Sequence, residues 1–182
     1  MAGYCALACR MLIGIVFAAS AFSKLRSKTE YRAFARWLGQ LPLPGPLRGA
    51  PAAAAVAVTE TAIVVLLIPA ATAAAGLVLS AVTLAAFSAG TLVTVRRGPA
   101  IPCRCFGASQ SPMSTWHVAR DLLLALLAAA AAVAASTPAP APAPAPGGIA
   151  LALAVAVTAA VPTVLFDDLL SIFRLPASGL RA

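Results

Sequence analysis

"APAAAAVAVTETAIVVLLIPAATAAAGLVLSAVTLAAFSAGTLVTV", residues 50 to 95, contains a single charged side chain, that of Glu60. A helix needs about 20 apolar residues to cross a bilayer core about 30 Å thick, so this stretch is too long for one crossing. Pro69 interrupts it and marks a turn. Backbone groups in lipid must be hydrogen-bonded within the protein, which favours helices over open strands. The stretch therefore predicts a hairpin of two transmembrane helices.

Three other stretches are long and apolar enough to cross a membrane, and they comprise residues 4–22, 118–135 and 149–166. Only 10% of all residues are charged, against about 25% in an ordinary soluble domain. We take the first stretch as a helix rather than a signal peptide because no basic segment precedes it. We predict an all-α, multi-pass protein of the cell membrane that is surrounded by the lipid bilayer.

The segment "STPAPAPAPAPGG", residues 136 to 148, divides the chain into two unequal parts. A Pro-Ala repeat favours extended polyproline II structure and cannot pack a core. We expect residues 1–135 to form a four-helix membrane domain and residues 136–148 to be a linker. A fifth transmembrane helix is expected over residues 149–166, followed by a tail, residues 167–182.

Basic residues are concentrated in three segments of the chain. Of thirteen lysines and arginines, six lie in residues 23–50, three in residues 96–117 and two in the tail. Five crossings place these segments on one side of the membrane, which the positive-inside rule assigns to the cytoplasm. The net charge of +8 is thus a topology signal. Because no basic patch is interleaved with base-stacking aromatic residues, we expect no nucleic acid partner.

The segment between the first two crossings, residues 27–41, has the pattern of an amphipathic helix. Ser27 and Glu30 form a capping-box pattern at its start. The apolar residues that follow recur at helical spacing and are Tyr31, Phe34, Leu38 and Leu41. This helix would lie along the membrane surface. The alternative is a plain connector held at the interface by Trp37.

"PCRCFG", residues 102 to 107, places Cys103 and Cys105 one residue apart in a loop. Thiol–disulfide exchange needs a thiolate and a second thiol that resolves the mixed disulfide, and this pair supplies both. Arg104 would favour the thiolate, as would two nearby basic residues, Arg96 and Arg97. A disulfide closed over one residue is tight and therefore easily reduced. The alternative is a pair of incidental loop cysteines.

Other arrangements of the cysteines have less support. With His117, the loop pair offers three metal ligands, whereas a closed zinc site has four, so we predict no metal site. Cys5 and Cys9 share one face of the first helix, near the opposite membrane surface. They are roughly 20 to 30 Å from the loop, too far to bridge to it, and we interpret them as small apolar residues.

Charged residues inside the predicted helices are costly and call for partners. A charge at mid-bilayer costs at least about 2.5 to 3.5 kcal/mol. Counted from the basic side, Arg10 and Glu60 fall at similar depth, and we expect them to form a buried ion pair. Glu60 could also handle protons or contact a quinone head group; alternatively, the pair only fixes the helix register. Arg120 and Asp121 are expected to line the inner wall of the cysteine loop, or to snorkel toward the membrane surface.

In combination these features resemble the MauE proteins of methylamine utilisation, within the wider MauE/DoxX-like group of redox-associated membrane proteins. The resemblance covers residues 5–135. It rests on Arg10, "AFSKL" (residues 21–25), "LPLP" (residues 41–44), Glu60, the Cys-x-Cys-Phe-Gly loop and "STWHVARD" (residues 114–121). It implies a four-helix membrane bundle that acts in disulfide chemistry, with the light chain of methylamine dehydrogenase as the family's substrate. Such substrates are exported, whereas the charge pattern places the loop in the cytoplasm, and both possibilities stay open.

Three functions are therefore compared. The first is a thiol–disulfide redox protein in which Cys103 and Cys105 exchange electrons with a disulfide-containing protein, a thioredoxin-like partner or a quinone. The second is a non-catalytic assembly or maturation factor. The third, a small-solute carrier using Arg10 and Glu60, ranks last because no inverted repeats are visible. Hydrolase and nucleotide-binding functions are excluded, since their motifs are absent.

Overall fold

The computed structural model describes the chain except for residues 1, 99–100, 107–111, 137–144 and 167–182. The protein is an all-α membrane protein. Within the described residues, five helices are long and apolar enough to cross a membrane. These helices are α1 (Ala2–Leu25), α3 (Gly49–Leu67), α4 (Ala73–Arg97), α5 (Thr115–Ser136) and α6 (Pro146–Val164).

The hairpin predicted over residues 50–95 is confirmed. Helix α3 ends at Leu67, and a short 3-10 helix, η2 (Ala70–Thr72), follows Pro69 and leads into α4. Gly76, on the first turns of α4, allows the two helices to pack closely. A Cβ atom there would lie 3.0 Å from Leu67 Cδ2, so a larger residue would push α3 and α4 apart.

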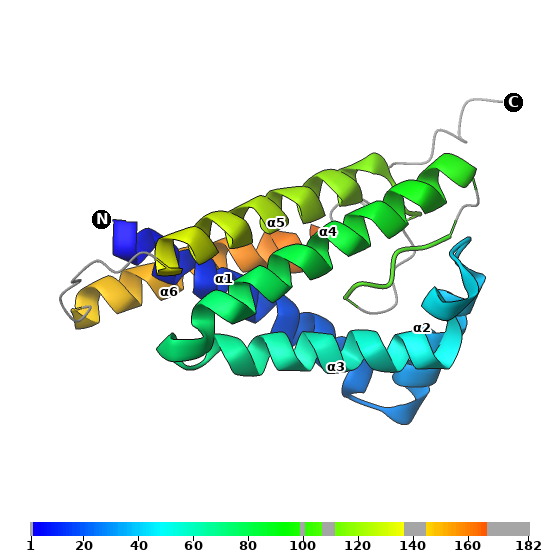
Figure 1. The fold of residues 1–182 in the computed structure, drawn as a ribbon, viewed down its shortest axis with the longest axis horizontal. Helices are drawn as coiled ribbons and strands as arrows, with labels where there is room; N and C mark the ends of the chain where they lie inside the picture. Colours follow the sequence, from blue (N-terminus) through cyan, green and yellow to red (C-terminus); the bar gives the residue numbers. More distant parts are fainter. Residues whose placement is uncertain (1, 99–100, 107–111, 137–144, 167–182) are drawn as a thin grey trace, which may run out of the picture.

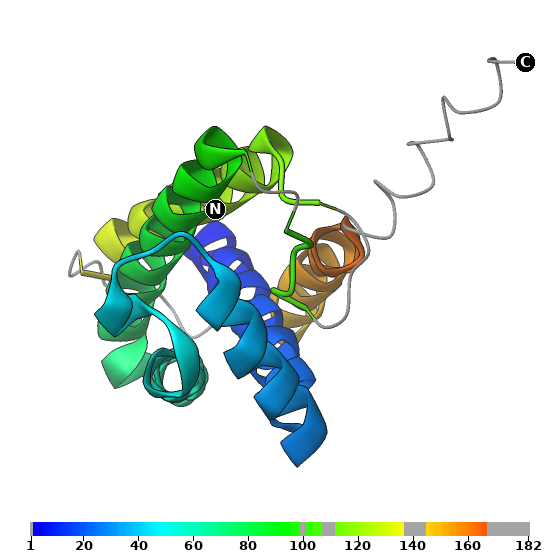
Figure 2. The same ribbon diagram turned by 90° about the vertical axis from the view of Figure 1, so that its right-hand side faces the viewer.

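Helix α1 lies in the middle of the bundle. Helices α4 and α5 run side by side, and α1 packs between this pair, α3 and α6 (Figures 1 and 2). The core that these helices share includes Ile13 of α1, Ile63 of α3, Leu77 of α4 and Ala156 of α6, all almost completely buried. Helix α6 thus packs against the other helices. It begins at Pro146, three residues before the predicted start, while most of the predicted linker and the tail lie outside the described residues.

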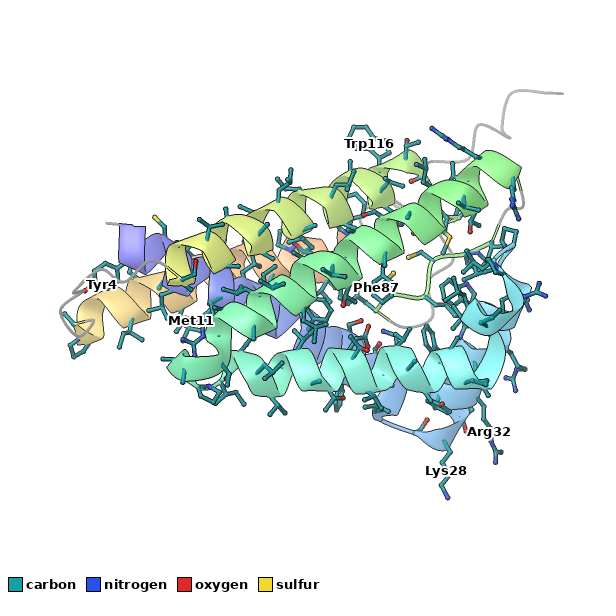
Figure 3. The ribbon with its side chains drawn as sticks, viewed as in Figure 1. Tyr4, Met11, Lys28, Arg32, Phe87 and Trp116 are labelled. Carbon is teal, nitrogen blue, oxygen red and sulfur yellow. The ribbon has the colours of Figure 1, made fainter. Side chains whose placement is uncertain are left out.

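The amphipathic helix predicted over residues 27–41 is α2 (Lys28–Gln40). Ser27 caps it by accepting a hydrogen bond from the Glu30 backbone N–H at 3.2 Å. Its apolar face is buried against α3 and α1, whereas Lys28 and Arg32 point away from the bundle (Figure 3). A second 3-10 helix, η1 (Gly45–Leu47), connects α2 to α3.

One end of the bundle gathers the cysteine loop and the described parts of two predicted basic segments, residues 23–50 and 96–117. The end of α1, all of α2, the start of α3, the end of α4 and the start of α5 meet there (Figure 1). The opposite end holds the start of α1 and the turn between α3 and α4. The loop between α4 and α5 therefore lies beside α2, where the site described next is built.

Candidate functional site

Two backbone carbonyls at the start of the cysteine loop accept hydrogen bonds that hold the loop in place. The indole N–H of Trp37, on the buried face of α2, donates a hydrogen bond of 2.7 Å to the Pro102 carbonyl. The backbone N–H of Met113 donates one of 3.0 Å to the Ile101 carbonyl, where the two sides of the loop meet. These contacts fix the loop residues that carry the thiols against the end of the bundle.

The two loop thiols face one another in reduced form. The Cys103 thiol donates a hydrogen bond to Cys105 Sγ, with a sulfur–sulfur distance of 3.5 Å. A disulfide bond is about 2.05 Å long, so a modest movement of the sulfurs would close the ring. Cys103 is 1% exposed and Cys105 is half-buried. Cys105 is therefore the thiol that a partner reaches more readily.

Beneath Cys105 lies a buried cluster of three polar side chains, Ser20, Lys24 and Glu60, which we call the carbonyl clamp. Lys24 Nζ donates to the Cys105 carbonyl at 3.0 Å and to Glu60 Oε1 at 2.9 Å. Ser20 Oγ lies 2.9 Å from the same carbonyl oxygen and 2.8 Å from Glu60 Oε1, and its single hydroxyl proton is donated to one of the two at a time. The clamp thus ties the thiol loop to α1 and α3.

Helix geometry explains how the clamp is assembled. Ser20 and Lys24 are four residues apart and share one face of α1, and Lys24 Nζ lies 2.6 Å from Ser20 Oγ. Glu60 faces them from α3 and is completely buried, while Lys24 is 4% exposed. Lys24 also lies over the Phe34 ring of α2, 5.0 Å from its centroid. Buried charges persist only when they are paired and hydrogen-bonded, and Lys24 and Glu60 are both.

A second charged pair borders the loop from α5. Arg120 and Asp121 form an ion pair of 2.9 Å and are both buried. The Arg120 guanidinium lies 5.3 Å from the centroid of the Phe106 ring, next to Cys105 in sequence. Arg120 Nη1 is buried and has no hydrogen-bond partner among the described residues.

The surroundings of Cys105 favour its thiolate. The hydrogen bond from Cys103 is the main cause that lowers the pKa of the Cys105 thiol. The positive charges of Arg120 and Lys24 act in the same direction, whereas burial and the charge of Asp121 oppose them. The net effect is a pKa below the ordinary value, as expected for a reactive cysteine.

A small cavity adjoins Cys105. It has a volume of about 20 Å³, and Ser20, Phe87, Cys105 and Arg120 contribute to its walls. This is room for about one water molecule. Sites for drug-sized organic molecules are typically about 300–1,000 Å³, so a quinone ring does not fit in this cavity.

His117 lies in the first turn of α5 and contacts residues on either side of it. Its Nδ1 accepts a hydrogen bond of 3.1 Å from the Ser114 backbone N–H, and its ring packs edge-on against Phe166 at 5.7 Å. In the part of the chain that the structure describes, no three His, Cys, Asp or Glu side chains gather as metal ligands would. The neighbouring Trp116 points outward from the bundle (Figure 3).

Residues 2–135 match the model of the family described as methylamine utilisation protein MauE. The chain belongs to the MauE family. The matched region contains α1 to α5, the cysteine loop and the whole carbonyl clamp. The DoxX-like part of the predicted resemblance stays a prediction. No curated protein and no solved structure matches the chain.

In this member of the MauE family, the predicted Arg10–Glu60 ion pair is wrong. Arg10 instead donates to the carbonyls of Leu67, at 2.7 Å, and Ile68, at 2.6 Å. Helix α1 continues past Phe22 to Leu25, which places Arg10 nearer the opposite membrane surface than the sequence count assumed. The terminal carbonyls of α3 are free to accept hydrogen bonds there. Glu60 takes its charge partner from the end of α1.

The structure brings together some predicted site residues of this MauE protein and leaves others apart. Cys103, Cys105, Glu60 and Arg120 gather around the loop, as described above. Arg104 is half-buried, and in the described part it makes no hydrogen bond or ion pair. The positive charges that lower the pKa of the Cys105 thiol are those of Arg120 on α5 and Lys24 on α1. The expected action of Arg104, Arg96 and Arg97 on the thiol pair stays a prediction.

Sequence reasoning missed Ser20 and Lys24 as site residues. The charge pattern places Lys24 among the basic residues outside the membrane, yet its side chain, in the last turn of α1, is buried among the helices. The available signal was a serine and a lysine four residues apart at the end of an apolar helix, with a single carboxylate in the next helix. Such a carboxylate needs a cation, and the family motif "AFSKL" contains the lysine that supplies it.

Proposed function

We propose that this MauE-family protein is a membrane thiol–disulfide redox protein in which Cys105 attacks and Cys103 resolves. The observation that carries the proposal is the hydrogen-bonded pair of thiols, 3.5 Å apart, in a loop fixed to the bundle. The lowered pKa of the Cys105 thiol and its partial exposure support its role as the attacking group. The burial of Cys103 suits a thiol that reacts only within the protein.

The reaction is an exchange of one disulfide for another. The Cys105 thiolate attacks a disulfide of a partner protein, forms a mixed disulfide and releases one partner thiol. The Cys103 thiolate then attacks Cys105 Sγ, closes the Cys103–Cys105 disulfide and releases the second partner thiol. The partner gains two electrons and two protons, and the loop loses them. In reverse, the oxidised loop passes its disulfide to a partner dithiol.

The partner is a protein with a reducible disulfide or a thioredoxin-like dithiol. The family description, methylamine utilisation, favours a partner that belongs to that metabolism. The cysteine loop and the described parts of two basic segments, residues 23–50 and 96–117, lie at the same end of the bundle (Figure 1), which supports a cytoplasmic loop by the positive-inside rule. An impermeant maleimide applied to intact cells tests this topology. Cys105 should stay unlabelled until the membrane is permeabilised, and labelling from outside would place the loop on the exported side.

Single-cysteine variants test the exchange. Cys103→Ser leaves the mixed disulfide unresolved, so it should accumulate a partner adduct that runs as a larger species on a non-reducing gel and disappears with reductant. Cys105→Ser should accumulate none. Cys5→Ser, which alters an exposed cysteine at the other end of the bundle, is the matched control and should behave as the unaltered protein. An adduct in neither loop variant would refute the exchange.

A non-catalytic maturation factor is the second candidate. It is favoured by the near-complete burial of Cys103, which also suits a thiol that only packs the loop against the bundle. This function predicts that the double variant Cys103→Ser/Cys105→Ser still supports methylamine-dependent growth. The redox function predicts that growth is lost, while the protein level in membranes stays normal.

A further inference from the structure

An apolar groove runs along the outer face of α1, between α3 and α6, well away from the cysteine loop. It has a volume of about 400 Å³. Its walls include Met11, Gly14 and Ala18 of α1, Val64 of α3 and Leu153 of α6. Met11 is labelled in Figure 3. A volume of this size is typical of a site for a small molecule rather than of a packing defect.

The groove follows the helix axis. Leu7, Met11, Gly14 and Ala18 are spaced by four, three and four residues, which places them on one face of α1. At 1.5 Å per residue, the groove extends over roughly 16 Å of the helix. It therefore runs from near the start of α1 toward the middle of the membrane, as the acyl chain of a lipid does.

Arg10 is the charged residue in the wall of the groove. Its Nε and Nη2 atoms donate to the carbonyls of Leu67, the last residue of α3, and of Ile68, which follows it. The guanidinium is therefore held at the end of the apolar span that α3 forms. A guanidinium has five N–H donors, so donors remain for a ligand. In the described ranges no carboxylate pairs with Arg10.

We propose that this groove binds one anionic phospholipid, with its phosphate on Arg10 and an acyl chain along Met11, Gly14 and Ala18. The charge at the head of the groove decides the ligand. A phosphodiester would neutralise the arginine and accept its remaining N–H groups, and arginine is well suited to phosphate oxygens. A quinone is neutral, so it would leave the positive charge uncompensated at the membrane border.

The direction of the groove agrees with this ligand. The charged end lies at the membrane border and the apolar end lies toward the bilayer centre, which is the order of head group and chain in a phospholipid. Ala18 and Leu153, which line the groove, are exposed in the bundle itself and would be covered by the acyl chain. The site is independent of the thiol pair, so it goes beyond the proposed redox function.

Native mass spectrometry of the full-length, delipidated protein in detergent tests the proposal. Phosphatidylglycerol, phosphatidylcholine and ubiquinone are titrated separately. We expect phosphatidylglycerol to bind most tightly, and Arg10→Gln to weaken it about five-fold, the effect of one basic residue at an anionic lipid surface. Arg48→Gln, at an exposed arginine on the opposite membrane border, is the control and should leave this affinity unchanged.

A second variant separates lipid binding from folding, because Arg10 also caps α3. Ala18 lines the groove and is exposed, so a larger side chain there does not enter the packing between helices. Ala18→Leu should narrow the groove and reduce phosphatidylglycerol binding while Arg10 and the melting temperature stay unchanged. Equal binding of both phospholipids, tighter binding of ubiquinone, or unchanged binding in Ala18→Leu would each overturn the proposal.

Discussion

Replacing Lys24 by methionine is the most demanding test of the carbonyl clamp. Methionine keeps much of the length of lysine but removes the ammonium group. Glu60 then loses contacts of 2.9 Å and 3.1 Å to Lys24 Nζ. The Cys105 carbonyl loses its Lys24 donor, and the single Ser20 hydroxyl proton is left for both acceptors. A completely buried carboxylate is left without a cation.

The expected cost follows from the burial of both partners. Removal of one member of a buried ion pair destabilises a protein by about 3–5 kcal/mol. At about 2–4 °C per kcal/mol for a protein of this length, the melting temperature should fall by roughly 6–20 °C. The Arg26–Glu30 pair offers a matched control, because its distance is similar, 3.0 Å, but Arg26 is 51% exposed. Arg26→Met should cost no more than about 0.5 kcal/mol.

The assay is thermal unfolding of the purified protein in detergent, followed by tryptophan fluorescence. The double variant Lys24→Met/Glu60→Met extends the test, because replacing a whole buried pair with apolar residues is often neutral or stabilising. We expect it to recover most of the lost melting temperature. Alkylation of Cys105 near neutral pH should nevertheless stay slower than in the unaltered protein, because the Lys24 charge that lowers the pKa of the Cys105 thiol is gone. A Lys24→Met variant as stable as Arg26→Met would refute the buried pair.

Three other predictions concern the loop and the helix packing. The rate of Cys105 alkylation should rise with pH to a plateau, and the midpoint of the rise should lie below about pH 8.5, the ordinary thiol pKa. Cys103→Ala should move that midpoint upward, because it removes the hydrogen bond that lowers the pKa of Cys105. Trp37→Phe leaves a loop carbonyl without its donor, so it should cost about 1–3 kcal/mol in thermal unfolding and speed alkylation of both loop thiols. Gly76→Ala should lower the melting temperature by overpacking α3 against α4, whereas Gly90→Ala, whose Cβ meets nothing within 4 Å, should not.

Local features of the chain were predictable because they depend on neighbours in sequence. The hairpin at Pro69, the capped helix after Ser27 and the apolar crossings follow from spacing, composition and turn chemistry. The position of Cys103 and Cys105 in a loop at the end of the bundle follows from the same pattern. The match over residues 2–135 confirms the MauE part of the resemblance.

The contacts between helices were not predictable in the same way. Glu60 needed a cation, but its choice of Lys24 over Arg10 depends on how far α1 extends beyond Phe22 and on how α1 and α3 align. Arg10 instead donates to carbonyls at the end of α3, and backbone acceptors of this kind leave no pattern in the sequence. The cations near Cys105 likewise come from α1 and α5 rather than from adjacent positions in the loop.

The redox state of the loop pair in native membranes tests the central claim most directly. Free thiols are blocked with a maleimide of known mass, the sample is reduced, and newly exposed thiols are labelled with a heavier maleimide. We predict that part of the protein carries the heavy label on Cys103 and Cys105 together, and that prior treatment of cells with reductant removes it. If both residues always carry only the light label, whatever the oxidant or reductant, the pair does not cycle and the redox function is contradicted.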